Sequence, residues 1–214
     1  RRRFPSAVHF PYDPVSQSAI AAANKKDFGV GVIPHYRFDR ARVIVGVNAD
    51  FLGTWLSPVE FARAYAKGRR EGASKMSRHI QIESRMSLTG SNADLRLIAA
   101  PSEEKGLLRE MLKEISNGKG ELREARGESL VVCGTNDIET QTLVNAINAR
   151  LGNIGRTIDL DNPFQGKQGR EGDVVRLVDE MEKGNIAALL VHNANPAYDL
   201  PEAKSFQSAM RKVG

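Results

Sequence analysis

Short apolar runs alternate along this chain with longer segments in which apolar residues recur every three or four positions. The short runs predict strands, because nearly continuous apolar sequence is typical of parallel strands that are covered on both faces. They lie at residues 42–47, 79–82, 95–98, 129–134 and 186–191. The amphipathic segments predict helices at residues 57–68, 102–116, 136–151, 174–184 and 201–212. This alternation predicts an α/β fold with mainly parallel sheets.

Two of the predicted helices begin with recognisable capping residues. Ser57-Pro58-Val59-Glu60 is typical of a capping box with proline at the first helical position, and Asn136 with Glu139 is typical of a second capping box. The first 40 residues fit the pattern less regularly. There we expect strands at residues 7–10 and 30–33 and a short helix at residues 13–24.

A segment rich in glycine and charge, residues 118–127, is the best candidate for a linker. It divides the chain into a first α/β unit, residues 1–118, and a second, residues 127–214. An internal echo supports two related units: residues 45–50 read VGVNAD and residues 190–195 read LVHNAN, and a proline follows each before the next helix. We therefore predict two Rossmann-like, doubly wound units, in which ligands bind beyond the carboxyl ends of the strands.

Composition excludes several classes of protein. The chain has 214 residues, a formal net charge of +5 and one cysteine, Cys133. One cysteine cannot form an internal disulfide, a cysteine-based metal site or an iron–sulfur cluster. The basic residues are dispersed and aromatic residues make up 6% of the chain, so we expect no nucleic-acid partner. Residues 1–3 are arginines without a following apolar stretch or a preceding Met, and we expect the chain to be part of a longer one.

The common nucleotide-binding motifs are absent from the sequence. Gly29-Val30-Gly31 lacks the later glycine of a dinucleotide fingerprint, and Gly166-Lys167 lacks the upstream glycine of a phosphate-binding loop. The four histidines do not have metal-ligand spacing, and Cys133 at the end of an apolar strand is expected to be a buried thiol. The loop at residues 83–90, ESRMSLTG, has two readings: a structural turn, or a phosphate contact made by Arg85 and Ser87.

Several long runs resemble one protein family: the molybdopterin oxidoreductase-like half of the exported iron–sulfur subunit of alternative complex III, a quinol:electron-acceptor oxidoreductase. The resemblance covers nearly the whole chain. The runs are residues 12–16 (YDPVS), 34–39 (PHYRFD), 49–60 (ADFLGTWLSPVE), 76–80 (MSRHI), 83–94 (ESRMSLTGSNAD) and 151–155 (LGNIG). The wider relation is to molybdopterin guanine dinucleotide enzymes.

The resemblance implies a pocket at two strand ends and one loop. In those enzymes a strand ending in Gly-x-Asn-Pro lines the guanine dinucleotide site, and an Asp-Pro-Arg-Arg-Thr loop accompanies it. This sequence departs from both motifs, and two further carboxylates, Glu103 and Glu104, stand where the diphosphate would approach. The implied residues of a vestigial pocket are Asn48, Asp50, Glu83, Ser84, Arg85, Ser87, His192, Asn193 and Asn195.

The function implied by the resemblance is that of a cofactor-free scaffold domain supporting electron transfer and complex assembly. Iron–sulfur clusters would belong to sequence outside these residues. The implied partners are a haem-bearing cytochrome c subunit and an integral membrane quinol-oxidising subunit, on the periplasmic side of a bacterial inner membrane. Export would use a signal that these residues do not contain. Two alternatives stay open: part of a molybdopterin guanine dinucleotide-dependent oxidoreductase, and a module that binds another nucleotide.

Overall fold

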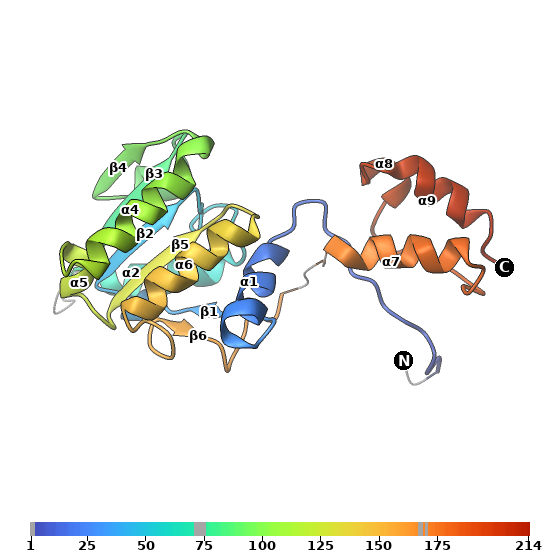
Figure 1. Ribbon diagram of the computed structural model, residues 1–214, viewed down its shortest axis with the longest axis horizontal. Helices are drawn as coiled ribbons and strands as arrows, with labels where there is room; N and C mark the ends of the chain where they lie inside the picture. The colour runs from blue at the N-terminus through green and yellow to red at the C-terminus, as the bar shows by residue number, and fades with distance from the viewer. Residues whose placement is uncertain (1–2, 71–75, 167–168, 170) are drawn as a thin grey trace. The chain divides into compact units, whose positions relative to one another are not determined.

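The computed structural model describes residues 3–70, 76–166, 169 and 171–214. Within it the chain forms two compact units. The larger unit is Ala19–Gly166, and the smaller unit combines Arg1–Ser18 with Lys167–Gly214. All the strands of the described residues belong to the larger unit, whereas the smaller unit carries helices α7, α8 and α9 (Figure 1).

The larger unit alternates strands with helices in chain order (Figure 1). Its strands are β1 (His35–Tyr36), β2 (Val43–Val47), β3 (Arg78–Glu83), β4 (Leu95–Ile98), β5 (Ser129–Cys133) and β6 (Ile158–Asp159). Its α-helices are α1 (Ser18–Phe28), α2 (Pro58–Arg69), α3 (Leu88–Ser91), α4 (Glu104–Ser116), α5 (Glu121–Glu124) and α6 (Ile138–Arg150). Two 3-10 turns complete it, η1 (Phe38–Arg40) and η2 (Pro101–Glu103).

Four of the strands form one parallel sheet in the order β4-β3-β2-β5. β2 lies in the interior of the sheet, where Val43 is opposite Arg78 on one side and opposite Ser129 on the other. All five residues of β2 are buried, as expected for a strand covered on both faces. The predicted α/β class with a parallel sheet is therefore confirmed. β1 and β6 form a separate antiparallel pair.

Each face of the sheet packs against its own apolar cluster. One cluster is rich in aromatic rings, and in it the rings of Phe38 and Phe51 stack with 4.3 Å between centroids. The other cluster joins the sheet to the helices that follow β4 and β5, and Leu108 and Ile147 are its fully buried helical members. The aromatic members of the first cluster are Tyr36, Phe38, Phe51, Trp55, Phe61 and Tyr65.

The prediction of two separate sheets is wrong for the described residues. β5 pairs with β2 over five residues, from Val43 opposite Ser129 to Val47 opposite Cys133, so one sheet uses strands from both predicted units. Residues 127–166 accordingly belong to the same compact unit as residues 19–118. The local pattern identifies both strands correctly, but it does not say which strands will be neighbours, because pairing is settled by long-range packing.

The smaller unit also differs from its prediction. The apolar run at residues 186–191 does not form a strand; it is irregular, and Leu190 is 95% exposed. A strand requires a neighbouring strand for its backbone groups, and none lies beside this run among the residues that the structure describes. Instead Ile186 and Leu189 pack against a helical core, the buried members of which are Leu177, Met181, Phe206 and Ala209.

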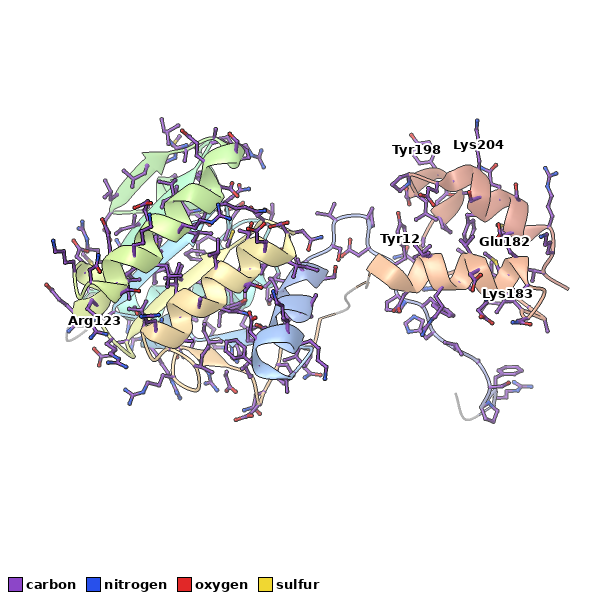
Figure 2. The ribbon with its side chains drawn as sticks, in the orientation of Figure 1. Tyr12, Arg123, Glu182, Lys183, Tyr198 and Lys204 are labelled. Carbon is purple, nitrogen blue, oxygen red and sulfur yellow. The ribbon has the colours of Figure 1, made fainter. Side chains whose placement is uncertain are left out.

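Three helices make up this smaller unit: α7 (Glu171–Glu182), α8 (Pro196–Asp199) and α9 (Ala203–Met210). The two predicted helices at residues 174–184 and 201–212 correspond to α7 and α9 with shifted ends. Pro196, not Pro201, opens the helix after the second echo. Tyr198 on α8 and Lys204 on α9 are exposed on the surface of this unit (Figure 2).

Near the N-terminus two predicted strands are absent and one helix is displaced. Residues 7–10 and 30–33 have no strand assignment, and the helix expected at residues 13–24 is α1 (Ser18–Phe28). Ile33 is 6% exposed and packs in the aromatic cluster, and its carbonyl accepts a hydrogen bond from Phe164 N. Ile33 is thus buried as part of a loop and not in a ladder, while Val8 and Val30 are exposed.

Candidate functional site

The carboxyl ends of β2 and β5 meet at the point where the order of the sheet reverses. From β2 the chain proceeds outward through β3 to β4, and it then returns to the other side of β2 as β5. Ligands of open α/β sheets bind in the crevice that such a reversal creates. Asn48 follows β2 and Gly134 follows β5. The carboxyl ends of β2 and β5 are therefore a candidate ligand-binding site.

The two strand ends approach each other very closely at this point. A Cβ atom on Gly134 would lie 2.0 Å from the carbonyl oxygen of Asn48, so only glycine fits there. Asn48 itself is exposed and has a left-handed backbone, with a φ of 49°. The backbones of the two strand ends therefore fill the space between them.

Asp50, the next predicted site residue, organises its own loop. Its carboxylate Oδ1 accepts hydrogen bonds from the Thr89 backbone N at 3.1 Å and from Thr89 Oγ1 at 2.8 Å. Thr89 Oγ1 in turn accepts from the backbone N of Leu52 at 2.9 Å. Asp50 thus ties the loop after β2 to α3, which follows β3.

Glu83, at the end of β3, is 3% exposed and is surrounded by donors. Oε1 accepts from Ser87 N at 3.0 Å and from Arg96 Nε at 2.8 Å. Oε2 accepts from Ser87 Oγ at 2.6 Å and from Gln81 Nε2 at 3.2 Å. Burial pushes the pKa of Glu83 upward, but the hydrogen bonds from Ser87 and Arg96 outweigh it and hold the pKa below its usual range.

The structure thus places six of the predicted residues at one end of the sheet, and it gives Glu83, Ser84, Arg85 and Ser87 different roles. Glu83 and Ser87 bond to each other, and Ser87 also caps α3 by accepting from Gly90 N. Ser84 and Arg85 are exposed, and neither makes a hydrogen bond or ion pair with a described residue. The structural reading of the loop at residues 83–90 fits Glu83 and Ser87, while Arg85 stays available to an external group.

The three remaining predicted residues lie in the smaller unit. His192, Asn193 and Asn195 are all exposed. Asn193 has a φ of 52°, close to the 49° of Asn48, so the first Asn of each echo adopts the same left-handed conformation. The carbonyl of Asn195 accepts hydrogen bonds from the backbone N of Tyr198 and Asp199 and starts α8.

The N-terminus of α6, beside the strand reversal, is closed by a carboxylate of the chain itself. Asp137, and not the predicted Asn136, is the N-cap, because its side chain accepts from Thr140 N at 2.8 Å. The hydrogen bonds from Thr140, with those from Lys105, lower the pKa of Asp137 to about 2. Nearby, the hydroxyl of Thr135 donates to the buried carboxylate of Glu104. The anion-binding end of this helix is therefore occupied.

A row of buried polar side chains runs along β3, and two of its members, His79 and Gln81, are not among the predicted site residues. His79, Gln81 and Glu83 alternate on one face of the strand and are 0%, 0% and 3% exposed. Tyr65 Oη lies 3.0 Å from His79 Nδ1, and His79 Nε2 lies 3.3 Å from Gln81 Oε1. Burial lowers the pKa of His79 to about 4, although the hydrogen bond that His79 Nε2 donates to Gln81 Oε1 acts in the opposite direction. The sequence pattern that could have predicted this row is the polar residue at every second position of RHIQIE, residues 78–83.

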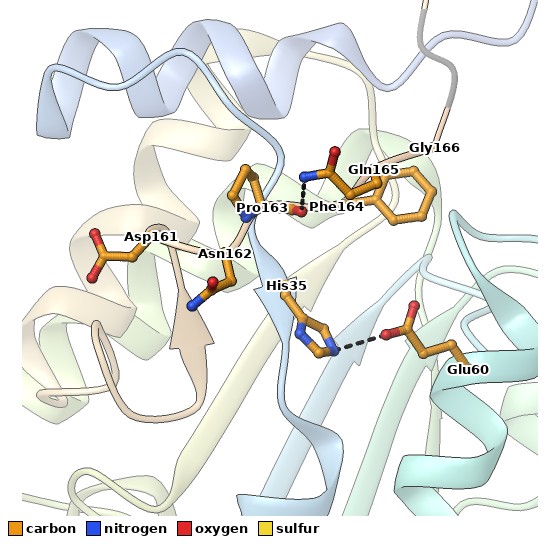
Figure 3. Close-up of a pocket in the computed structure, with 8 residues that line it drawn as sticks. All are labelled: His35, Glu60, Asp161, Asn162, Pro163, Phe164, Gln165 and Gly166. Carbon is orange, nitrogen blue, oxygen red and sulfur yellow. Dashed lines mark hydrogen bonds and ion pairs between the residues drawn. The ribbon is translucent and has the colours of Figure 1, made fainter.

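A cavity of about 500 Å³ lies elsewhere in the larger unit, beside β1 and the first turn of α2. In it His35 Nε2 donates to Glu60 Oε1 at 3.0 Å (Figure 3). Glu60 therefore pairs with His35 and does not complete the predicted capping box, and Ser57 makes no capping hydrogen bond through its side chain. Asp161 points away from this pair, and Gln165 Nε2 bonds to the Pro163 carbonyl at 3.0 Å (Figure 3).

Other chemistry-bearing groups are inert in the described part of the chain. Cys133 is 1% exposed, and burial raises the pKa of its thiol to about 11, so it is a protonated core residue. Within residues 3–70, 76–166, 169 and 171–214, no three His, Cys, Asp or Glu side chains are grouped as a metal site would require. None of the helices described there has the length and apolarity needed to cross a bilayer.

The site can hold a polar group at its rim but offers little to a buried dinucleotide. Its inward-facing carboxylates, Asp50, Glu83 and Glu104, already accept hydrogen bonds from the protein, and they repel phosphate. Asn48, Ser84 and Arg85 are exposed polar residues at this end of the sheet. Comparison of the chain with known protein families and with curated proteins found no match.

Proposed function

We propose that this chain is a cofactor-free, molybdopterin oxidoreductase-like scaffold domain of the iron–sulfur subunit of a respiratory quinol:electron-acceptor oxidoreductase. The family assignment rests on the sequence runs that carry the resemblance, above all ADFLGTWLSPVE at residues 49–60 and ESRMSLTGSNAD at residues 83–94. The strand order β4-β3-β2-β5 supports a Rossmann-like reading of the larger unit, because it matches the 3-2-1-4 order of that fold.

One observation carries the scaffold reading: the polar groups at the carboxyl end of the sheet are bonded to one another. Glu83 accepts four hydrogen bonds from Ser87, Gln81 and Arg96. A pyrophosphate would have to displace these donors from a buried carboxylate, and each lost bond to a charged group costs about 1.5–3 kcal/mol. The side chains that line this end therefore stabilise the loops themselves.

The fit to a molybdopterin guanine dinucleotide is poor on two further grounds. Asp137 occupies the N-terminus of α6, where a phosphate would gain most from the helix dipole. Gly134 and the carbonyl of Asn48 leave no room between the two strand ends. We accordingly derive no chemical step through such a cofactor in this chain.

The proposed role is assembly. In it the domain holds the cluster-bearing part of its own polypeptide beside a haem-bearing cytochrome c subunit and a membrane quinol-oxidising subunit, on the periplasmic side of the inner membrane. Electron transfer requires closely spaced cofactors, so a rigid domain that reacts with nothing still supports turnover. The two apolar clusters on either side of the parallel sheet provide such rigidity.

The test is made in the assembled complex. Asn48→Gly removes the amide but keeps the left-handed backbone, and Arg85→Ala removes the exposed cation. Both variants should leave quinol oxidation within about twofold of wild type, because neither group would contact a reacting atom. Leu108→Asp puts an unpaired charge into the core and should remove the complex from the membrane, at a cost of roughly 4 kcal/mol or more. Normal assembly with abolished turnover in Arg85→Ala would overturn the proposal.

Two alternative functions have their own measurements. A molybdopterin enzyme requires about one molybdenum atom per subunit in the purified complex, and that content would replace the scaffold reading. A module for another nucleotide is favoured by the exposed Asn48 and Arg85 at the strand reversal. It predicts that GDP or ATP raises the melting temperature of the 214-residue chain and that Arg85→Ala abolishes the rise.

A further inference from the structure

The outward side of β5 is closed by side chains. Gly134 N donates to Val47 O at 2.9 Å, so the even-numbered residues of this stretch face β2 and the odd-numbered residues face outward. Asn148 caps the central outward residue completely: its Oδ1 accepts from Val131 N at 3.1 Å, and its Nδ2 donates to Val131 O at 2.8 Å. No further strand can pair there without displacing Asn148.

Two more side chains bond to outward carbonyls of β5. Thr157 Oγ1 donates to Ser129 O at 2.6 Å, and Gln141 Nε2 donates to Cys133 O at 2.9 Å. The three capping side chains are buried, with exposed fractions of 1% for Thr157, 3% for Gln141 and 1% for Asn148. All three outward carbonyls of β5 therefore accept hydrogen bonds from side chains of the chain itself.

The opposite edge of the sheet, β4, has no such closure. Ala99 N donates to Glu83 O at 3.4 Å, so the odd-numbered residues of β4 face β3 and the backbones of Arg96 and Ile98 face outward. In the part of the chain that the structure describes, nothing hydrogen-bonds to these two outward backbones. Such an edge is a template for another strand.

Exposed apolar side chains on β4 favour association at this open edge. Leu95 and Leu97 are 38% and 44% exposed, and Ile98 is 77% exposed. α3, the helix between β3 and β4, is a single turn of 4 residues and leaves Ile98 uncovered. Exposed edges in stable monomers usually carry a proline, a bulge or an unpaired charge that prevents pairing. Arg96, the one charged side chain of β4, is bound to Glu83 at 2.8 Å.

We propose that β4 pairs antiparallel with β4 of a second copy of this chain, across a twofold axis at Leu97. A second copy can offer its own four-stranded sheet only through β4, because its β5 edge is capped by Asn148, Gln141 and Thr157. Head-to-tail addition of sheets is excluded by the same caps, and the contact closes as a symmetric dimer. The proposal is independent of the proposed function.

The register of this pairing is self-complementary. With the axis at Leu97, Arg96 of one copy lies opposite Ile98 of the second copy, and the two outward residues exchange their N–H and C=O bonds. Leu97 faces Leu97 of the second copy in the non-hydrogen-bonded position, where side chains are closest. No like charges are opposite each other, and the aliphatic stem of Arg96 covers Ile98 while Glu83 neutralises its guanidinium.

The experiment measures self-association of the 214-residue chain by sedimentation equilibrium. A four-residue strand gives an interface at the small end of specific contacts, so we expect a dissociation constant on the order of 10–100 µM. Ile98→Pro removes the outward N–H and suits an edge strand, and it should weaken association at least about tenfold without lowering the melting temperature. Leu190→Lys, at an even more exposed apolar residue in the smaller unit, is the control and should associate like wild type.

Amide exchange distinguishes this edge from any other surface. As concentration rises through the dissociation constant, the amides of Arg96 and Ile98 should become protected, while that of Val131 is protected throughout. A wild-type chain that stays monomeric overturns the proposal, and so does a dimer in which the β4 amides exchange freely. Equal association of Ile98→Pro and wild type would overturn it as well. Protection of these amides only on adding a different protein would overturn the self-pairing and show that another polypeptide fills the edge.

Discussion

The two edge strands of the sheet, β5 and β4, differ in whether side chains bond to their outward backbone groups. At β5 three buried side chains bond to the Val131 N–H and to the three outward carbonyls, whereas at β4 the outward backbones of Arg96 and Ile98 have no partner among the described residues. Both strands are apolar, so hydrophobicity does not separate them. The difference lies in the next helix along the chain: β5 leads into α6, which carries Gln141 and Asn148 on the face toward the strand. At β5, the helix that follows the strand supplies two of the side chains that bond to its outward backbone groups.

The largest effect is expected from removing the central cap. Asn148→Leu keeps the size of the side chain but leaves the N–H and C=O of Val131 buried without partners. Two unsatisfied buried groups cost about 4 kcal/mol together, measured as the free energy of unfolding in urea. Asn145→Leu on the same helix removes only an exposed bond to Asp27 and should cost less than about 0.5 kcal/mol. Equal costs for the two variants would show that the cap contributes nothing.

Acid should destabilise the larger unit through the buried His79 on β3. Burial holds the pKa of His79 at about 4, below the ordinary 6.5, so the unfolded chain binds the extra proton first. The stability that neutral His79 provides is complete above pH 6.5 and is lost as pH falls toward 4, by about 3 kcal/mol.

The measurement compares urea unfolding at several pH values in wild type and in His79→Gln. The variant has no titrating group at this position, so its stability should change little between about pH 6.5 and pH 4.5. The carboxylates near His79, Glu83 and Asp94, have lowered pKa values and stay ionised in this range. A wild-type profile that is equally flat would contradict the burial-driven pKa of His79.

A smaller effect should follow from the cap at the start of β5. Thr157→Val conserves shape but leaves the Ser129 carbonyl without its donor, which costs about 1–2 kcal/mol of unfolding free energy. The matched change Thr54→Val breaks an exposed bond to Asp50 and should be close to neutral, within about 0.5 kcal/mol. If Thr54→Val proves the costlier of the two, the closure of the β5 edge rests on Asn148 and Gln141 alone.

Local pattern was sufficient for most elements of the larger unit and insufficient for their partners. The runs at residues 42–47 and 129–134 are strands as predicted, because each is apolar on both faces. Their adjacency in one sheet is a matter of packing between residues far apart in the chain. The run at residues 186–191 is also apolar, but it pairs with no strand among the described residues and is irregular. Apolar sequence therefore shows that a segment will be covered, not which element will cover it.

The candidate site was predictable in position and less so in role. Asn48, Asp50, Glu83 and Ser87 were expected at strand ends, and they do lie at the carboxyl end of the sheet. The partner of Asp50, Thr89, could not be inferred, because its contact depends on how two loops meet. Gln141 and Asn148 did leave a signal: two amides seven residues apart, on the helix face that also carries Val144 and Ile147.

The position of the β5 caps in the sequence has a consequence during synthesis on the ribosome. Gln141, Asn148 and Thr157 all follow β5, and Thr157 comes 24 residues after Cys133 (157 − 133). At translation rates of about 5–20 residues per second, β5 emerges a few seconds before Thr157, the last of the residues that cap it. During that interval the nascent chain presents a bare apolar strand, the kind of segment that chaperones bind. In the folded protein β5 is capped, so this interval leaves no trace in the structure. Slower translation would lengthen it.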